Sequence, residues 1–351
     1  MKKIAMLSDT HFGIRKNNKV YLESQMRFFR EQFIPELKAA GVKTIFILGD
    51  LFHSRTSVEI SIFHEVFNLF LNDLAEFDIA ILTGNHDLYY ADTTEVTSLD
   101  MISSLSNVSI IDEFTMHDVD LDTKLAFFPW ITDSDKFKQD IKTLKKNPAK
   151  YIFGHFDIIG CSMNSKVKSM VGFKPTIFKG TCEQLFTGHY HTPSDKKSGG
   201  VGIKYLGSPY QTDRTDLDLA RGYYILDIDD DTVEFVENTK SMKHITVEYP
   251  DTIPDDSENY ITTLVIDSDK VEKKRDLYKY LDAVSAQTHL VVPHIKYISS
   301  ALKADVEDMQ VDSMTEMKDV IVEYAKTVDG IDDKKDAVIN KLNETYDKVL
   351  G

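Results

Sequence analysis

Several residue types and patterns are scarce in this chain of 351 residues, and each shortage excludes a class of protein. Only two cysteines are present, Cys161 and Cys182, so no disulfide framework holds the chain together, and a reducing cytoplasm fits. No stretch approaches the roughly 20 consecutive apolar residues that a membrane-spanning helix needs. The apolar run near the start ends after Leu7. That is too short for the roughly 7–15 apolar residues of a secretory signal peptide.

Basic residues are fewer than acidic ones, with 41 lysines and arginines against 57 aspartates and glutamates, a formal net charge of −16. Proteins that bind nucleic acid unaided usually present a basic surface. The negative charge can simply serve solubility. Alternatively, any phosphate binding depends on bound metal ions or on a partner subunit. The rest of the composition, with 42% hydrophobic residues, is ordinary for a folded protein of about two domains.

The first 250 residues alternate between short apolar runs and amphipathic stretches, which predicts an α/β fold. A helix is expected over 20–40, with a kink at Pro35 and with Gly41 as its C-cap. The stretch 56–59 resembles a capping box that opens a second helix, and another helix is expected near 134–146. Strands are predicted at 4–8, 44–48, 79–82, 125–128, 151–153, 185–187 and 204–206.

After residue 222 the pattern changes, and three stretches predict an antiparallel meander at 223–228, 232–236 and 244–249. The acidic stretch 250–257 resembles a linker, and a strand–helix–strand unit follows it. The chain ends in two amphipathic helical stretches. We therefore predict a main domain at 1–249, a small α+β capping domain at 258–300 and a helical hairpin at 312–350.

Polar side chains follow five of the predicted strands directly. They lie in Asp9-Thr10-His11, Gly49-Asp50 with His53, Gly84-Asn85-His86-Asp87, Gly154-His155 and Gly188-His189-Tyr190-His191. In α/β sheets, ligands bind where the strands end at their carboxyl side. One buried histidine is usually an ordinary core residue, but these five places hold six of the eleven histidines. The pattern therefore predicts one shared site.

The residue types at this site favour particular metals. Mixed carboxylate, amide and imidazole ligands suit manganese, iron or zinc better than calcium or magnesium. Seven candidate ligands exceed the four of a structural zinc site. Two metals that share one carboxylate explain that number. Such pairs lie about 3.5–4 Å apart and clamp the attacking and leaving oxygens of a phosphate ester.

The motif order D-x-H, G-D, G-N-H-D, G-H and G-H-x-H resembles that of the calcineurin-like metallophosphoesterases. Further details resemble the nuclease subunits of SbcCD-type double-strand-break repair complexes, including bacteriophage recombination endonucleases. These details are His53 three residues after Asp50, the pair Pro129-Trp130, and the run Gly207-Ser208-Pro209-Tyr210-Gln211. The shared motifs cover roughly residues 1–240. In the remainder only the order of the predicted elements is similar. The resemblance implies a four-layer αββα sandwich with a capping domain and a C-terminal helical hairpin.

The resemblance also implies a role for each site residue. One divalent metal ion would be held by Asp9, His11, Asp50 and His191. The other would be held by Asp50, Asn85, His155 and His189, with Asp50 bridging; Mn²⁺ is expected, with Mg²⁺ as the alternative. His86 resembles the family's catalytic histidine, the general acid, and His53 resembles the histidine that orients phosphate. Apart from the resemblance, Asp87 can orient His86, form a structural salt bridge or cap the loop. Arg15 and Lys16 are weaker candidates for DNA contacts, or solvated loop charges.

The implied function is metal-dependent hydrolysis of DNA phosphodiester bonds, exo- and endonucleolytic, within an ATPase-coupled complex for recombination, repair and replication. The implied partners are double-stranded DNA ends, an SbcC-type SMC-like ATPase bound through 312–350, and a second copy bound through 58–74 and 94–105. The hairpin can instead pack on its own domain. No membrane is involved, and the expected location is the cytoplasm, the host's for a viral protein. The rivals are a phosphomonoesterase or cyclic phosphodiesterase on the same core, and a non-catalytic scaffold.

Overall fold

The computed structural model describes residues 3–121, 123–163, 167–217, 219–256, 259–267, 270–271, 273–287 and 291–296. The predicted hairpin at 312–350 lies outside these residues. The site and its surroundings belong to one compact unit, Met1–Ile266 with Lys273–His294. Within the described ranges, no helix combines the length and the apolar character that crossing a bilayer requires.

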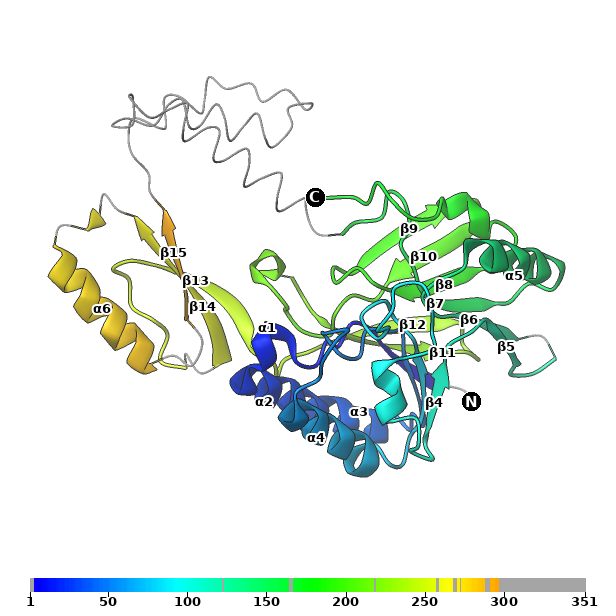
Figure 1. Cartoon of the computed structure of the whole chain (residues 1–351), viewed down its shortest axis with the longest axis horizontal. Helices are drawn as coiled ribbons and strands as arrows, with labels where there is room; N and C mark the ends of the chain where they lie inside the picture. Colours follow the sequence, from blue (N-terminus) through cyan, green and yellow to red (C-terminus); the bar gives the residue numbers. More distant parts are fainter. Residues whose placement is uncertain are drawn as a thin grey trace, which may run out of the picture. The chain divides into compact units, whose positions relative to one another are not determined.

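The first of two six-stranded sheets has the strand order β12-β11-β1-β2-β3-β4 (Figure 1). Strands β1 to β4 run parallel to one another, and β4 lies at the edge of the sheet. Strand β11 pairs antiparallel with β1, and β12 pairs antiparallel with β11. Every residue of β2 is buried, as expected of a parallel strand covered on both faces. The strands are β1 (Lys3–Leu7), β2 (Thr44–Ile47), β3 (Asp78–Leu82), β4 (Val108–Ile111), β11 (Gly222–Asp227) and β12 (Thr232–Glu237).

The second sheet has the order β5-β6-β7-β8-β10-β9. Its four central strands are parallel, and the edge strands β5 and β9 pair antiparallel with their neighbours. The strands are β5 (Thr115–Asp118), β6 (Lys124–Phe128), β7 (Tyr151–His155), β8 (Gln184–Gly188), β9 (Ser194–Ser198) and β10 (Val201–Tyr205). The central strands coincide with the predicted ones, apart from a few residues at their ends.

The two sheets pack face to face, and helices cover their outer faces. The ring of Phe46 in β2 lies 5.2 Å from that of Phe127 in β6 and 4.9 Å from that of Phe153 in β7. Two further apolar clusters lie on the outer faces, one under the helices of the first sheet and one under α5 (Figure 1). This is the predicted four-layer αββα sandwich. Its helices are α1 (Ile14–Asn17), α2 (Lys19–Phe28), α3 (Ile34–Ala39), α4 (Ile60–Asn68) and α5 (Ser134–Lys146).

The helix predicted over 20–40 forms in three parts. A π-helical turn at Phe29–Phe33 separates α2 from α3, and Pro35 lies in the first turn of α3. Proline has no amide hydrogen and crowds the preceding turn, so the expected irregularity is present. Gly41 follows α3 with a φ of 69°, the left-handed conformation that ends many helices.

The capping box predicted at 56–59 is wrong. Helix α4 begins at Ile60, and its N-cap residue Glu59 makes no side-chain cap hydrogen bond. Reciprocal capping boxes occur instead in two short 3₁₀ turns, at Thr97 with Asp100 and at Asp213 with Asp216. The four-residue pattern fitted position 56 as well, but the backbone becomes helical only at Ile60, so no first helical turn follows Thr56 for its side chain to cap.

The predicted meander is wrong at its third strand. Strand β13 (Lys243–Glu248) leaves the first sheet and pairs parallel with β14 (Tyr260–Asp267). Together with β15 (Val291–Lys296) these form a three-stranded sheet, and α6 (Lys274–Gln287) connects β14 to β15. The alternation of apolar and polar residues predicted β13 as a strand, but it did not predict which strand β13 pairs with. Its first buried amide, that of His244, bonds to the side chain of Gln211 at 2.6 Å, which directs it away from β12.

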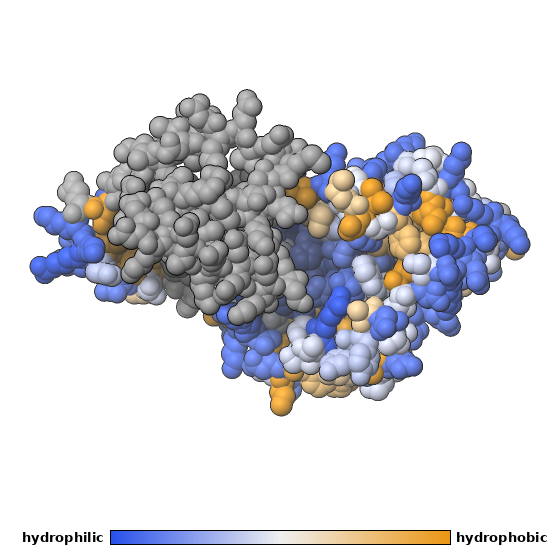
Figure 2. Space-filling model, turned by 45° about the horizontal axis from the view of Figure 1, so that its top comes forward, coloured by the Kyte–Doolittle hydropathy of each residue, from blue (hydrophilic) through white to orange (hydrophobic). Residues whose placement is uncertain are grey.

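The domain limits 1–249, 258–300 and 312–350 remain predictions, although β13, within the first range, pairs with a strand of the second. The dimer segment 58–74 contains α4 and a π-helical turn at Leu69–Asp73, whereas 94–105 contains only a 3₁₀ turn at Ser98–Met101. On the face drawn in Figure 2, hydrophobic residues occur singly or in small groups among hydrophilic ones. Such scattered apolar residues are normal on a protein surface.

Candidate metal centre

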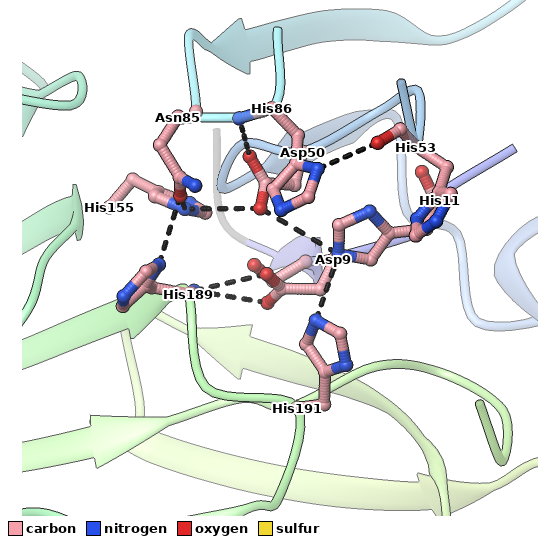
Figure 3. Close-up of polar contacts among 12 residues, drawn as sticks. Asp9, His11, Asp50, His53, Asn85, His86, His155, His189 and His191 are labelled. Carbon is pink, nitrogen blue, oxygen red and sulfur yellow. Dashed lines mark hydrogen bonds and ion pairs between the residues drawn. The ribbon is translucent and has the colours of Figure 1, made fainter. Parts of the chain in front are cut away.

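The side chains that follow β1, β2, β3, β7 and β8 meet at the carboxyl ends of these strands, so both sheets contribute to one cluster (Figure 3). The turns that carry them are unusual. Four non-glycine residues there have positive φ: Asp9 (54°), His11 (44°), Asp50 (56°) and His189 (94°). Such conformations each cost about 1–3 kcal/mol and concentrate at functional sites. Gly84 is needed because a Cβ there would lie 2.2 Å from Oδ1 of Asp50.

The first group of donor atoms comes from Asp9, His11 and His191, and these atoms lie within 4.8 Å of one another. Nε2 of His11 lies 2.8 Å from Nε2 of His191, so two ring nitrogens face each other directly. Asp9 is fully buried, and both of its carboxylate oxygens accept the amide hydrogen of His189, at 3.1 and 3.2 Å. Ligands at about 2.0–2.2 Å from one ion lie roughly 3 Å apart, which fits this convergence.

The second group comes from Asp50, His155 and His189, with the amide of Asn85 between the two rings. Oδ1 of Asn85 lies 3.0 Å from Nε2 of His155 and 2.9 Å from Nδ1 of His189. On the far side of the His155 ring, Nδ1 bonds to the backbone carbonyl of Leu48 at 2.7 Å. That bond holds the ring with Nε2 directed into the cluster.

Asp50 lies between the two groups. Its Oδ2 is 3.6 Å from Nε2 of His11 and 3.5 Å from Nε2 of His155, while Oδ1 accepts the amide hydrogen of His86 at 2.8 Å. Its side chain is only 2% exposed. All seven predicted ligand residues are thus brought together, and one carboxylate oxygen faces both groups. The donor set fits two neighbouring divalent ions that share Asp50.

The charges of this buried cluster shift the pKa values of its members strongly. Burial alone would raise the pKa of Asp50, but the rings of His155 and His11 more than offset this, and the pKa lies below its usual range. Burial would lower the pKa of His155, but the Asp50 carboxylate raises it to about 9. Burial and the neighbouring His155 lower the pKa of His189 to about 3. The cluster therefore attracts positive charge to Asp50, the place where a metal ion would supply it.

His86 and His53 lie beside the first group. Their rings are stacked, with centroids 5.7 Å apart and an interplanar angle of 20°, and the His86 ring meets that of His11 edge-on at 4.8 Å. Nδ1 of His86 bonds to the backbone carbonyl of His53 at 2.6 Å, so this nitrogen carries a hydrogen. The other nitrogen, Nε2, is left to exchange a proton with a ligand. Burial lowers the pKa of His53.

Asp87 caps the loop. Its Oδ2 accepts the amide hydrogens of Asp50 and Gly84, each at 2.9 Å, and Oδ1 accepts that of Leu51 at 3.0 Å. The carboxylate is fully buried. These bonds tie the turn after β2 to the turn after β3 and so fix Asp50 relative to Asn85. Of the three roles considered for Asp87, these backbone bonds support the cap.

The weaker candidates differ from each other. Nη2 of Arg15 bonds to the backbone carbonyl of Thr212 and to Nε2 of His244, both at 2.8 Å, so this guanidinium is engaged within the chain. Lys16 is exposed. Both have positive φ, as does Asn17 after them.

The residues that support His191 were not predicted from the sequence. Nδ1 of His191 lies 3.3 Å from Oγ1 of Thr212, and the buried ion pair of Asp216 and Arg221 lies behind Thr212. The one available signal was the D-x-x-D pattern at 213–216, which corresponds to the capping box found there. Nothing in the spacing connects it with a histidine some twenty residues earlier.

Similarities to known proteins agree with this geometry. The chain is 24% identical over 351 residues to "Exonuclease subunit 1" of Enterobacteria phage T4, a match that covers 98% of both chains. Likeness to solved structures is weaker and carries no argument about function. One is an archaeal phosphodiesterase that is 16% identical; the match covers 67% of this chain and 99% of that chain, with a TM-score of 0.36. Another is GAP50 of Plasmodium, which is 13% identical; the match covers 86% of this chain and 98% of that chain, with a TM-score of 0.43.

The dimetal phosphatase of Danio rerio is similar in the same limited way, with 9% identity, 64% of this chain, 91% of that chain and a TM-score of 0.40. The family comparison is decisive by contrast. The model of the calcineurin-like phosphoesterases matches residues 2–193, more than half of the sequence, and spans all five motifs. The chain therefore belongs to the calcineurin-like phosphoesterase family.

Proposed function

We propose that this chain is a metal-dependent nuclease that hydrolyses DNA phosphodiester bonds, at ends and internally, as the nuclease subunit of an ATPase-coupled recombination and repair complex. The position of the Asp50 carboxylate carries the proposal. One of its oxygens lies about equally far from a donor nitrogen of each group, at 3.6 and 3.5 Å. A single shared carboxylate between two donor groups is the arrangement that two-metal phosphoesterases need.

In this proposal, the first ion is held by Asp9, His11, Asp50 and His191, and the second by Asp50, Asn85, His155 and His189. The donors are nitrogens and oxygens of mixed hardness, which suits Mn²⁺, with Mg²⁺ as the alternative. Two such ions stabilise the charge on the phosphate oxygens and activate water as the nucleophile. The chain's own contribution is to hold the donors close together, through Asp87 and the carbonyl of Leu48.

His86 is proposed as the general acid. Because its Nδ1 donates to the carbonyl of His53, Nε2 is the position from which a second proton would pass to the departing sugar oxygen. His53, stacked on His86, would orient the phosphate. Histidine suits this task because its ordinary pKa lies near neutral pH.

DNA is proposed as the substrate because the chain matches a protein named an exonuclease subunit over 98% of both lengths. The word subunit supports the proposal of a partner, an SbcC-type ATPase bound by 312–350. A homodimer is proposed through 58–74, where Ile60 is 83% and Leu71 45% exposed. The metal ions and the ATPase would supply the positive charge that a chain of net charge −16 lacks. Of the two DNA-contact candidates, exposed Lys16 is the better placed.

The test is digestion of end-labelled duplex DNA with Mn²⁺, with Mg²⁺ and with EDTA. Cleavage should require the metal and fall by about 10²–10⁴-fold in His86→Gln, while Mn²⁺ binding by this variant persists. The matched control is His117→Gln, an exposed histidine of β5, which should cleave like the wild type.

Three results would contradict the proposal or a part of it. Cleavage of p-nitrophenyl phosphate or a cyclic nucleotide without cleavage of DNA would favour a phosphomonoesterase or cyclic phosphodiesterase. A protein that binds no divalent transition metal would favour a non-catalytic scaffold. Undiminished cleavage by His86→Gln would remove His86 from the role of acid.

A further inference from the structure

A histidine that ligates a metal offers a lone pair at one ring nitrogen, so the other nitrogen carries the hydrogen and needs an acceptor. At His155 that acceptor is the backbone carbonyl of Leu48. At His191 it is a side chain, because Nδ1 lies 3.3 Å from the hydroxyl of Thr212. A carbonyl of the backbone cannot be removed by substitution, whereas a hydroxyl can.

A hydroxyl can donate or accept, so the direction of this bond depends on where the hydrogen of Thr212 points. Oγ1 of Thr212 lies 3.1 Å from Oδ2 of Asp216. This carboxylate oxygen also accepts the amide hydrogens of Thr212, at 2.7 Å, and of Asp213, at 3.2 Å. An ionised carboxylate only accepts. The hydroxyl therefore donates to Asp216 and presents a lone pair to His191.

The carboxylate of Asp216 reaches His191 by a second route. Its Oδ1 forms an ion pair with Arg221, and Arg221 also donates to the backbone carbonyl of His191. Asp216 and Arg221 are 2% and 3% exposed, so both act from the interior. One buried carboxylate thus fixes both the backbone and the ring of His191.

The contact on the opposite side of the His191 ring, at Nε2, also supports a hydrogen bond that His191 donates to Thr212. Nδ1 of His11 is buried and has no hydrogen-bond partner among the described residues, while its Nε2 faces Nε2 of His191 at 2.8 Å. Without a metal, His11 then carries its hydrogen on Nε2 and donates it to Nε2 of His191. His191 can accept only if its own hydrogen is on Nδ1, where Thr212 receives it.

We propose that Thr212, oriented by Asp216, is a positioning residue that keeps the hydrogen of His191 on Nδ1 and leaves Nε2 free to ligate a metal ion. The proposal rests on the ligand role assigned to His191 above. Partners of this kind typically change metal affinity by about 10–100-fold when removed, because they fix both the orientation and the tautomer of the ligand.

Thr212→Val tests the hydroxyl alone, because valine has the same shape and the backbone bonds of position 212 to Asp216 and Arg15 do not involve the side chain. Binding of Mn²⁺ by calorimetry should weaken about 10–100-fold at one of two sites, and Thr212→Ser, which keeps the hydroxyl, should restore it. The matched control is Thr262→Val. Thr262 is also buried, and its hydroxyl has no partner in the described part of the chain, so affinity should not change.

The second measurement needs no metal. Nitrogen NMR of the metal-free wild-type protein should show His191 with its hydrogen on Nδ1, and Thr212→Val should shift the ring toward the Nε2 form. Wild-type affinity in Thr212→Val, a Thr212→Ser variant as weak as Thr212→Val, or a hydrogen on Nε2 in the wild type would each overturn the proposal. If the wild type binds no Mn²⁺, the proposed function fails instead, and the tautomer still decides the direction of the hydrogen bond.

Discussion

The hydroxyl of Tyr210 links the core to the loop that carries Asp9 and His11, and its removal gives a sharp test of how that loop is held. Tyr210 is 1% exposed, and its hydroxyl donates to the carbonyl of Thr10 and accepts from Nε2 of Gln25 at 2.6 Å. Gln25 also donates to the Thr10 carbonyl, at 3.0 Å. Thr10 lies between two residues of positive φ, a strained turn that neighbouring contacts must maintain.

The size of the effect of Tyr210→Phe follows from these bonds. Two hydrogen bonds are lost, but the Thr10 carbonyl and the Gln25 amide still bond to each other, so no buried group is left without a partner. At about 0.5–1.5 kcal/mol per bond, the free energy of unfolding should fall by about 1–3 kcal/mol. That is well below the 5–15 kcal/mol typical of folded domains, so the protein should remain folded. The loosened turn should weaken Mn²⁺ binding by about tenfold.

The assay combines thermal unfolding with calorimetric titration of Mn²⁺. The matched control is Tyr223→Phe, which removes the hydroxyl of an equally buried tyrosine; this hydroxyl bonds to exposed Glu36 at 2.7 Å, away from the site. This control should lower stability without changing metal affinity. If Tyr210→Phe changes both quantities no more than Tyr223→Phe does, the reasoning that Tyr210 supports the metal-binding turn is refuted.

Three further outcomes are expected. Asp50→Ala should abolish binding of both ions, seen as loss of both transitions in a Mn²⁺ titration, and retention of one full-affinity site would argue against a shared carboxylate. The His86→Gln variant should bind duplex DNA more tightly with Mn²⁺ than with EDTA in fluorescence anisotropy, because the ions supply the positive charge; equal affinities would show that the ions do not attract phosphate. Deletion of 312–351 should abolish co-purification of the ATPase while sparing Mn²⁺-dependent cleavage, and an intact complex would place the docking surface elsewhere.

The α/β class and the site's location were predictable because both arise from local patterns. Buried parallel strands are short apolar runs, and the turn at their carboxyl end is where polar residues can converge. His155 and Asp50 are over a hundred positions apart, yet each directly follows such a run, and the sheet order then brings Oδ2 and Nε2 to 3.5 Å. The family resemblance supplied the pairing of these residues into two metal sites, which spacing alone did not.

Features that depend on long-range partners were not predictable in the same way. The pattern that marks β13 as a strand does not contain Gln211, whose side chain binds the His244 amide and helps to direct β13 to a different sheet. The run Gly-Ser-Pro-Tyr-Gln was noticed only by resemblance. The structure supplies its physical reason. The hydroxyl of Tyr210 donates to the Thr10 carbonyl, and the backbone carbonyl of Gln211 accepts a hydrogen bond from the hydroxyl of Tyr21 at 2.6 Å.

The net charge of −16 left two readings open, and the arrangement of the buried carboxylates favours one of them. Asp9, Asp50 and Asp87 are all at most 1% exposed and lie within one cluster, where burial raises the pKa of Asp9 and, with the Asp50 carboxylate, raises that of Asp87 to about 7, so the ionised carboxylates lack positive charge. Two divalent ions would bring four positive charges, more than enough to balance all three carboxylates, and would make the local sign positive. Salt at 0.1 M screens electrostatic interactions between exposed charges beyond roughly 10 Å. A phosphate at the strand ends is therefore attracted or repelled by the charge of this cluster more than by the net charge of the whole chain. An acidic protein can therefore act on an acidic polymer, provided that its metals are bound first.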